Sequence, residues 1–188
     1  MLTQEKKRFI SSKNELKSTR TLIVLAMMMA LSIIISSFRI RTPAFTISFG
    51  PLVKMYVGLL FGPVTGALYG FTLDILQFFI QNTGYAFFPG YTFTETLGVF
   101  LYGMFFYKKK FSLPRVFIAK LFVVIICNII LGTLWKAMMS GEDVIQLFFY
   151  YLPLRAAKNI IQWPVDSVIF YLIASAMIKT GIHNRLRD

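Results

Sequence analysis

The chain has 188 residues, of which 56% are hydrophobic and 16% aromatic, and its net charge is +12. A soluble domain of this length needs a more charged surface, so the composition favours a membrane protein. The basic residues lie in short blocks between long apolar runs, which argues against a nucleic-acid-binding face. The single cysteine, Cys127, excludes an intramolecular disulfide, and the single histidine, His183, leaves too few ligands for a His/Cys metal site.

The apolar runs in chain order predict the fold. Residues 1–20 are charged and are predicted to be a basic cytoplasmic tail. The first apolar run, 21–38, is longer than the roughly 7 to 15 residues of a signal-peptide core and lacks a convincing cleavage site, so we interpret it as a retained helix. Further runs cover 44–61, 64–80, 91–107, 116–139 and 152–178. The sequence therefore predicts an all-α bundle of six transmembrane helices over 21–180, with a short tail at 181–188.

The second and third runs are the uncertain pair in this count. Pro51 interrupts one run, and Gly62 and Pro63 form a very short joint between the two, so one helix is expected to be kinked or to cross the membrane only partly. Glycines recur every four residues at positions 58, 62, 66 and 70. Such a row allows another backbone to approach closely, and we interpret it as a packing surface and not as a ligand site.

The distribution of basic residues predicts that both termini are cytoplasmic. In a six-span arrangement the amino tail, the loop YKKKFSLPR and the carboxyl tail share one side and carry nearly all the loop cations. The opposite loops, around QNTGYAFFPG and SGEDVIQ, contain no basic residue. Arg39 and Arg41, after the first helix, are exceptions, because they fall on the outer side.

Several ionisable residues fall inside the apolar runs, although each costs about 2.5 to 3.5 kcal/mol at the centre of a bilayer. They are Lys54, Asp74, Glu95, Lys120, Lys136, Arg155, Lys158 and Asp166. Helix direction and rise place most of them, with Arg39 and Arg41, near the outer end, while Lys120 and Asp166 are deeper. Lys120 and Lys136 are typical of interfacial anchors.

The segment YLPLRAAKNIIQWPVD carries Arg155, Lys158, Gln162 and Asp166 at intervals of three or four residues, so they form one stripe on a helix. One interpretation is that the stripe lines a ligand cavity. The alternative is that Arg155 and Lys158 extend to the outer headgroups. Asp166, the deepest of the four, has no assigned ligand role, and we interpret it as pairing with a neighbouring helix.

Aromatic residues gather at the same outer end, among them Phe88, Tyr91 and Trp163. An interfacial aromatic belt explains many of them. Rings beside cations and carboxylates also suit a planar heteroaromatic ligand with acidic groups, and Glu95 would accept hydrogen bonds from an amino-substituted ring. The sequence contains no phosphate-binding glycine loop and no serine with a nearby histidine, so we expect no enzyme activity and no cofactor, and any ATPase is expected on separate subunits.

These segments resemble the substrate-binding S components of energy-coupling factor (ECF) vitamin transporters, most closely the folate-specific group. The resemblance covers about residues 20 to 180. It rests on the size and six spans, AMMMA with Ala26 and Ala30, LLFGPVTGALYGFTLDIL, FFPGYTFTETLGVFLYG and LPLRAAKNIIQWPVD.

The resemblance implies a subunit of the bacterial plasma membrane that binds folate from outside and works with a transmembrane T component and two cytosolic ATPases. Ala26 and Ala30 would contact the T component. Arg39, Arg155 and Lys158 would hold carboxylates or the pterin carbonyl, Glu95 would face pterin nitrogens, and Phe88, Tyr91 and Trp163 would stack, with Gln162 on the same wall. An S component for pantothenate or a queuosine precursor is an alternative. A small membrane enzyme or an assembly scaffold is another.

Overall fold

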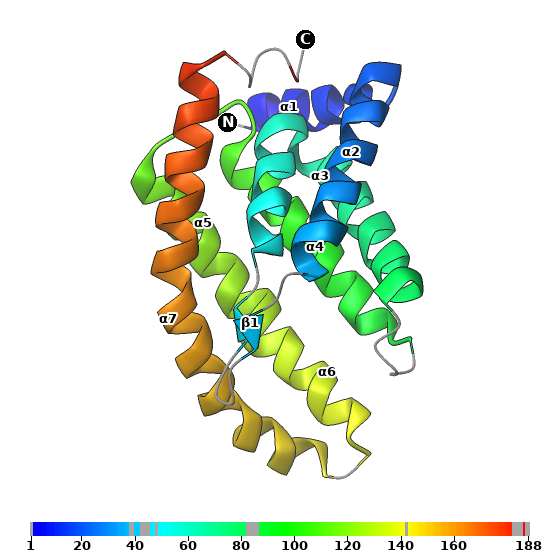
Figure 1. Ribbon diagram of the computed structural model, residues 1–188, viewed down its shortest axis with the longest axis vertical. Helices are drawn as coiled ribbons and strands as arrows, with labels where there is room; N and C mark the ends of the chain where they lie inside the picture. The colour runs from blue at the N-terminus through cyan, green and yellow to red at the C-terminus, as the bar shows by residue number, and fades with distance from the viewer. Residues whose placement is uncertain are drawn as a thin grey trace.

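The computed structural model describes residues 2–37, 40–41, 46–47, 49–81, 87–141, 143–181 and 186, with only the backbone described at 2, 3, 40, 41, 46 and 47. Its elements, in order, are α1 (Leu2–Glu15), α2 (Thr19–Ser37), β1 (Ile40–Arg41), β2 (Thr46–Ile47), α3 (Gly50–Gln81), α4 (Pro89–Phe106), α5 (Leu113–Val123), the π-helix η1 (Val124–Leu131), α6 (Gly132–Met139) and α7 (Val144–Lys179). Figure 1 shows α1 lying across one end of a bundle of lengthwise helices. We name the two ends of the bundle the α1 end and the α6–α7 end.

The expected all-helical architecture is confirmed, with one small addition. The two strands, each of two residues, form an antiparallel pair in which Ile40 lies opposite Ile47 and Arg41 opposite Thr46. Four helical stretches of the described chain are long and apolar enough to cross a membrane: Thr19–Ser37, Gly50–Gln81, Leu113–Met139 and Val144–Lys179. The third of these is a continuous rod made of α5, η1 and α6.

The long helix α3 is a tight hairpin of two helical halves. Gly62 has φ 83° and ψ −169°, values open to glycine but strained for other residues, and Pro63 begins the second half. Lys54, eight residues before Gly62, pairs with Glu95 of α4, and Gly70, eight residues after it, lies against the Glu95 backbone. Both halves therefore reach the same level of α4, which requires the chain to reverse at Gly62. Pro51 lies in the first turn of the first half, where proline is tolerated, and interrupts nothing.

The predicted glycine row packs both halves of α3 against α4. A Cβ atom at Gly58 would lie 2.8 Å from the Gly103 nitrogen, and one at Gly70 would lie 2.7 Å from the Glu95 carbonyl oxygen. Gly103 itself faces the turn, because its Cβ would lie 2.5 Å from the carbonyl carbon of Gly62. The absence of side chains at these positions lets the backbones touch, as the sequence predicted.

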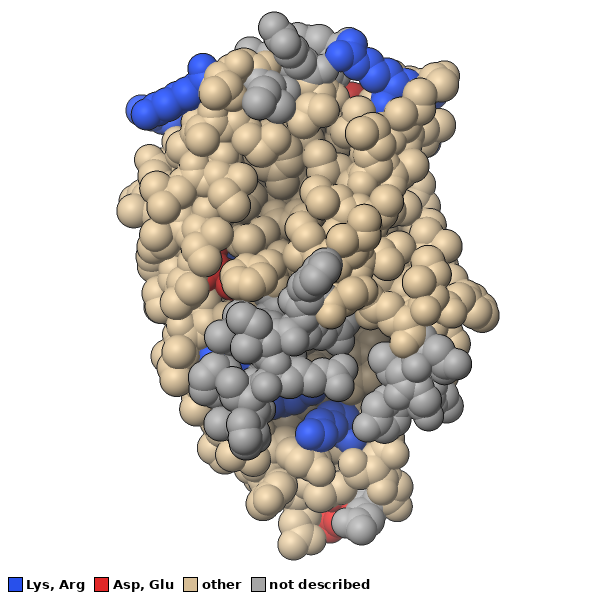
Figure 2. All heavy atoms as spheres, viewed as in Figure 1, with Lys and Arg blue, Asp and Glu red and all other residues tan. Residues whose placement is uncertain are grey.

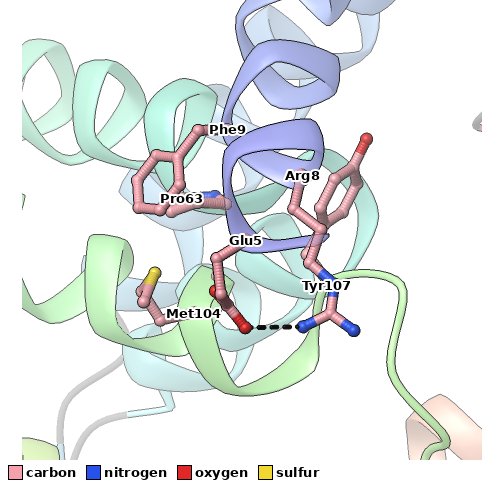
Figure 3. A pocket seen from close by; sticks show the side chains of 7 residues that line it. Glu5, Arg8, Phe9, Pro63, Met104 and Tyr107 are labelled. Atoms are coloured by element: carbon pink, nitrogen blue, oxygen red, sulfur yellow. Dashed lines mark hydrogen bonds and ion pairs between the residues drawn. The ribbon is translucent and has the colours of Figure 1, made fainter. Parts of the chain in front are cut away.

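The charged segment 1–20 contains a helix, α1, that docks on the α3 hairpin. The hydroxyl of Ser12, which is buried, donates to the Phe61 carbonyl at 2.7 Å and accepts from the backbone nitrogens of Val64 (3.1 Å) and Thr65 (3.2 Å). One serine thus caps the end of one half of α3 and the start of the other. Figure 3 shows Glu5, Arg8 and Phe9 of α1 beside Pro63, Met104 and Tyr107.

A buried ion pair joins α5 to α7. The Lys120 ammonium lies 2.8 Å from the Asp166 carboxylate, and their side chains are only 4% and 2% exposed. The expectation that Lys120 is an interfacial anchor is therefore wrong, because its charge is held inside the bundle. The interpretation that Asp166 pairs with a neighbouring helix is confirmed. Lys136, in contrast, is exposed and lies over the Tyr151 ring at 4.2 Å, which fits an anchor.

Candidate functional site

The start of α4 supplies one wall of the candidate site. Phe88 is extended, Pro89 occupies the first helical turn, and the helix that follows carries Tyr91 and Glu95 one turn apart. Proline suits this position because its fixed φ is helical and its missing N–H would have no partner there. The helix therefore begins where the aromatic and acidic residues are presented together.

Acidic and basic side chains meet at this level of α4. Lys54 of the first half of α3 forms an ion pair with Glu95, with side-chain exposures of 14% and 36%. Asp74 of the second half accepts a hydrogen bond from the Thr92 hydroxyl at 2.7 Å. Both halves of the hairpin thus bring a charged group to the start of α4. The Glu95 carboxylate is partly exposed, so it can accept a hydrogen bond from a further donor.

Three rings lie beside these charges. The Phe88 ring is 6.0 Å from the Tyr91 ring and 5.7 Å from the Trp135 ring, both measured between centroids and in non-parallel arrangements. The Trp135 indole N–H donates to the Thr94 hydroxyl at 2.8 Å, which fixes the ring against α4. Sequence analysis missed Trp135; the available signal was an aromatic residue near the outer end of the fifth apolar run, next to Lys136.

Arg155 reaches this group from α7. Its Nη1 donates to the Asn128 carbonyl at 3.3 Å, and its guanidinium also interacts with the Tyr91 hydroxyl. Asn159, one turn further along, donates to the Arg155 carbonyl at 2.8 Å and accepts from the Asn128 amide at 3.1 Å. Lys158 of the same stripe is partly buried. The arginine is thus held inside the bundle by protein contacts, which does not favour free extension to a headgroup layer.

The deeper part of the predicted stripe contacts α5. Gln162 donates to the Asp166 carboxylate at 3.3 Å, and the Trp163 indole N–H donates to the Phe117 carbonyl at 2.9 Å. The Trp163 and Phe117 rings also meet edge to face, with centroids 5.4 Å apart. The predicted stripe is therefore divided: Arg155 interacts with Tyr91 of α4, whereas Gln162 bonds within α7 to Asp166, which pairs with Lys120 of α5. Arg39 lies outside the described residues.

Figure 2 shows basic side chains at the edge near the α1 end and in a recess of the lower half, with a surface between them that carries few charges.

A separate groove of about 300 Å³ runs along the first turns of α7, lined by Asp143, Gln146, Leu147 and Tyr150. The residues of the candidate site, Lys54, Phe88, Tyr91, Glu95, Trp135 and Arg155, do not line this groove. Within the described chain, no group of three or more His, Cys, Asp or Glu side chains is arranged to hold a metal ion.

The predicted partner-docking residues lie elsewhere. Ala26 and Ala30 of α2 are both exposed, together with the intervening Met27, whereas Met28 and Met29 pack against the hydrophobic core.

Comparisons with known proteins identify the family of the chain. Residues 20–174 match the family described as ECF transporter, substrate-specific component. The chain is 33% identical over 172 residues to the folate transporter FolT of Clostridium novyi (strain NT), covering 91% of this chain and 97% of the relative. It is 31% identical over 163 residues to FolT of Leuconostoc mesenteroides subsp. mesenteroides, covering 85% and 87%.

A solved structure shares the fold. The crystal structure of FolT bound with folic acid matches with a TM-score of 0.75 and 28% identity, over 85% of this chain and 95% of that chain. The apolar helices and the match over 20–174 lead to one conclusion: this protein belongs to the family of substrate-specific components of energy-coupling factor transporters.

Proposed function

We propose that the chain is the subunit of an ECF transporter that binds folate at the α6–α7 end of the bundle. The observation that carries the proposal is the position of Tyr91, which contacts the Phe88 ring, interacts with Arg155 of α7 and lies one helical turn from Glu95 on α4. Folate combines a planar amino-substituted ring with carboxylates, and this group offers a carboxylate, stacking rings and a cation. The similarity to FolT relatives and to a FolT structure with folic acid supports the same ligand.

The roles of the site residues follow from their chemistry. Glu95 accepts hydrogen bonds from the ring nitrogens of folate, and the neighbouring Lys54 forms an ion pair with the same carboxylate. Phe88, Tyr91 and Trp135 flank the ring. Arg155 and Lys158 hold the carboxylates or the ring carbonyl, and Arg39 completes the proposed cations. Trp163 supports this wall of the site by holding α7 against α5, and Gln162 lies on the same wall, where it bonds to Asp166.

The proposed topology has six membrane segments with both termini in the cytoplasm. The segments are α2, the two halves of α3, α4, the rod from α5 to α6, and α7. The loop cations support this orientation, since α1, the Lys108–Lys110 turn and Lys179 lie toward the α1 end. The first half of α3, residues 50–61, is about 18 Å long, so it crosses only part of the roughly 30 Å hydrocarbon core.

In this proposal, uptake of folate across the bacterial plasma membrane requires a transmembrane T component and two cytosolic ATPases. Ala26 and Ala30 form the proposed contact with the T component. Two small side chains one turn apart on an exposed helix face let another helix approach closely. Co-purification of the chain with such a module supports this assignment, whereas turnover of a substrate by the isolated chain contradicts it and favours a membrane enzyme.

The test is ligand selectivity of the purified full chain. Binding of folic acid, riboflavin, thiamine, pantothenate and a queuosine precursor is measured by titration calorimetry. We expect folic acid to bind most tightly, and Arg155→Ala combined with Lys158→Ala to weaken it without lowering helix content. Equal affinity for folic acid and riboflavin contradicts the folate assignment, and preferential binding of pantothenate or the queuosine precursor replaces it with another vitamin specificity.

A further inference from the structure

The rod from α5 to α6 changes its helical winding beside Arg155. Residues Val124–Leu131 form a π-helix, which is wider than an α-helix and is frequent at functional sites. The backbone N–H of Gly132, at the junction with α6, bonds to the carbonyls of Cys127 and Ile129. In an uninterrupted α-helix the partner of Gly132 would be the carbonyl of Asn128, four residues earlier. The change in winding thus directs the Gly132 N–H away from the Asn128 carbonyl, which accepts a hydrogen bond from a donor outside the rod.

Arg155 is that donor. Its Nη1 lies 3.3 Å from the Asn128 carbonyl oxygen. The guanidinium packs directly against Gly132, because a Cβ atom at this position would lie 2.4 Å from Arg155 Nη1 and 3.6 Å from its Cζ. Any side chain at position 132 would therefore occupy the place of the guanidinium.

The register of α7 on the rod is fixed one turn away. The Asn128 amide donates to Asn159 at 3.1 Å, and the Asn159 amide donates to the Arg155 carbonyl at 2.8 Å. Polar side chains that bond across membrane helices fix their relative position because unpaired amides are costly in hydrocarbon. The pair holds Arg155 opposite Gly132, within reach of the Asn128 carbonyl.

We infer that Gly132 and the Asn128–Asn159 pair are positioning residues that set the place of the Arg155 guanidinium for an anionic or carbonyl group of the ligand. The inference rests on the proposed function, in which Arg155 contacts folate. Rigid placement is effective because the planar guanidinium donates in a fixed geometry and loses little freedom on binding when it is already held.

The first test is Gly132→Ala. The severe conflict, at 2.4 Å, is with the end of the flexible Arg155 side chain, whereas the backbone oxygen of Cys127 at 3.2 Å needs to yield only slightly, so the fold is retained and the guanidinium moves. We expect folic acid affinity to fall about tenfold or more, as for loss of a well-placed charged hydrogen bond. The thermal stability of the unliganded protein is expected to stay level or rise, because alanine favours a helix more than glycine does. Unchanged affinity overturns the inference.

Gly98→Ala is the matched control. Its Cβ would lie 3.8 Å from Val123 Cγ1 and 4.0 Å from Cys127 Sγ, which are ordinary contacts. It makes the same chemical change inside a neighbouring helix without touching Arg155, so we expect wild-type affinity. An equal loss in both variants means that any added methyl group disturbs binding, and overturns the role of Gly132.

The second test is a double-variant cycle with Arg155→Gln. Glutamine is shorter than arginine, so the methyl group added by Gly132→Ala has no guanidinium to displace, and this substitution should have no further effect on affinity in the Arg155→Gln background. Additive losses of affinity show that Gly132 does not act through Arg155. That result overturns this inference and leaves the proposed function standing. If Arg155→Gln binds folic acid as wild type does, the ligand role of Arg155 in the proposed function fails, and the inference fails with it.

A third variant separates register from contact. Asn159→Leu removes the bridge to Asn128 but leaves Gly132 and the Asn128 carbonyl in place. We expect a loss of affinity of roughly threefold to tenfold, which Asn159→Gln partly restores because its longer amide still reaches across the helices. Full affinity in Asn159→Leu shows that the pair does not position Arg155.

Discussion

Lys54 and Glu95 form an ion pair between the first half of α3 and α4, and the second half of α3 passes the same residue at Gly70. The hairpin thus surrounds one acidic residue with two helical segments. A charge pair at this depth is stable only because each partner satisfies the other, and its partly exposed carboxylate retains capacity for one more donor.

Neutralising Glu95 tests its proposed role as the partner of the folate ring. Glu95→Gln keeps the size of the side chain and removes its charge. We expect folic acid affinity to fall about tenfold to hundredfold, because hydrogen bonds to a charged group contribute roughly 1.5 to 3 kcal/mol. Titration calorimetry measures the change. Asp143→Asn, an exposed cap of α7, is the control and should bind normally; a Glu95→Gln variant of wild-type affinity removes Glu95 from the site.

The buried pair of Lys120 and Asp166 is expected to determine stability. Asp166→Asn leaves the Lys120 ammonium without its counter-charge inside the bundle. Breaking such a pair costs about 3 to 5 kcal/mol, so the unfolding temperature in detergent should fall markedly. Lys120→Met with Asp166→Leu should recover most of this loss, because neither charge remains. A single variant that melts like wild type shows that the pair is not buried in the membrane-embedded protein.

Ser12 is expected to hold the hairpin turn. Ser12→Ala leaves the Val64 and Thr65 nitrogens and the Phe61 carbonyl without their partner. We expect a loss of about 1 to 2 kcal/mol in stability, typical of a lost helix cap. Ser11→Ala is the control, because the Ser11 hydroxyl bonds to the side chains of Tyr107 and Lys108 and not to the hairpin turn. Equal thermal unfolding of the two variants contradicts the capping role.

Gly103 is expected to tolerate no side chain. In Gly103→Ala the new Cβ would lie 2.5 Å from Gly62 carbon and Pro63 nitrogen, and backbone atoms cannot move aside as a side chain can. Such overpacking costs about 1 to 3 kcal/mol, so the variant should unfold at a lower temperature than Gly98→Ala. A similar melting temperature for both would show that α4 and the hairpin turn separate easily.

The exposed face of α2 is expected to affect transport without affecting binding. Ala26→Trp adds a large ring to the proposed T-component contact, so uptake of labelled folate by cells should be abolished while the purified chain binds normally. Leu172→Trp, on the 61% exposed leucine of α7, is the control and should leave uptake intact. Uptake that survives in Ala26→Trp means that α2 docks through another face.

The helix bounds in the structure differ from the sequence prediction at particular residues. The apolar run beginning at 152 belongs to a helix that starts at Val144, because Asp143 caps the backbone nitrogens of Ile145 and Gln146. The residues that follow this cap are largely apolar, and the cap at Asp143 is what sets the start of the helix. The segment 1–20 contains α1, whose low hydrophobicity hides it and whose position depends on Ser12 contacts with residues about 50 positions away.

Sequence alone determined the membrane class, the apolar helices and the glycine row, because hydrophobicity, helical period and glycine spacing are local properties. It also identified Phe88, Tyr91, Glu95 and Arg155 as candidates, since charges in apolar runs are costly and need a reason. Only the tertiary structure decided which of them meet. The reversal at Gly62 brings Lys54 to Glu95, the rod from α5 to α6 brings Trp135 to Thr94 of α4, and Arg155 of α7 reaches the Asn128 carbonyl. The packing of α7 on α5 pairs Asp166 with Lys120. These pairings depend on distant segments packing together, and no local pattern specifies them.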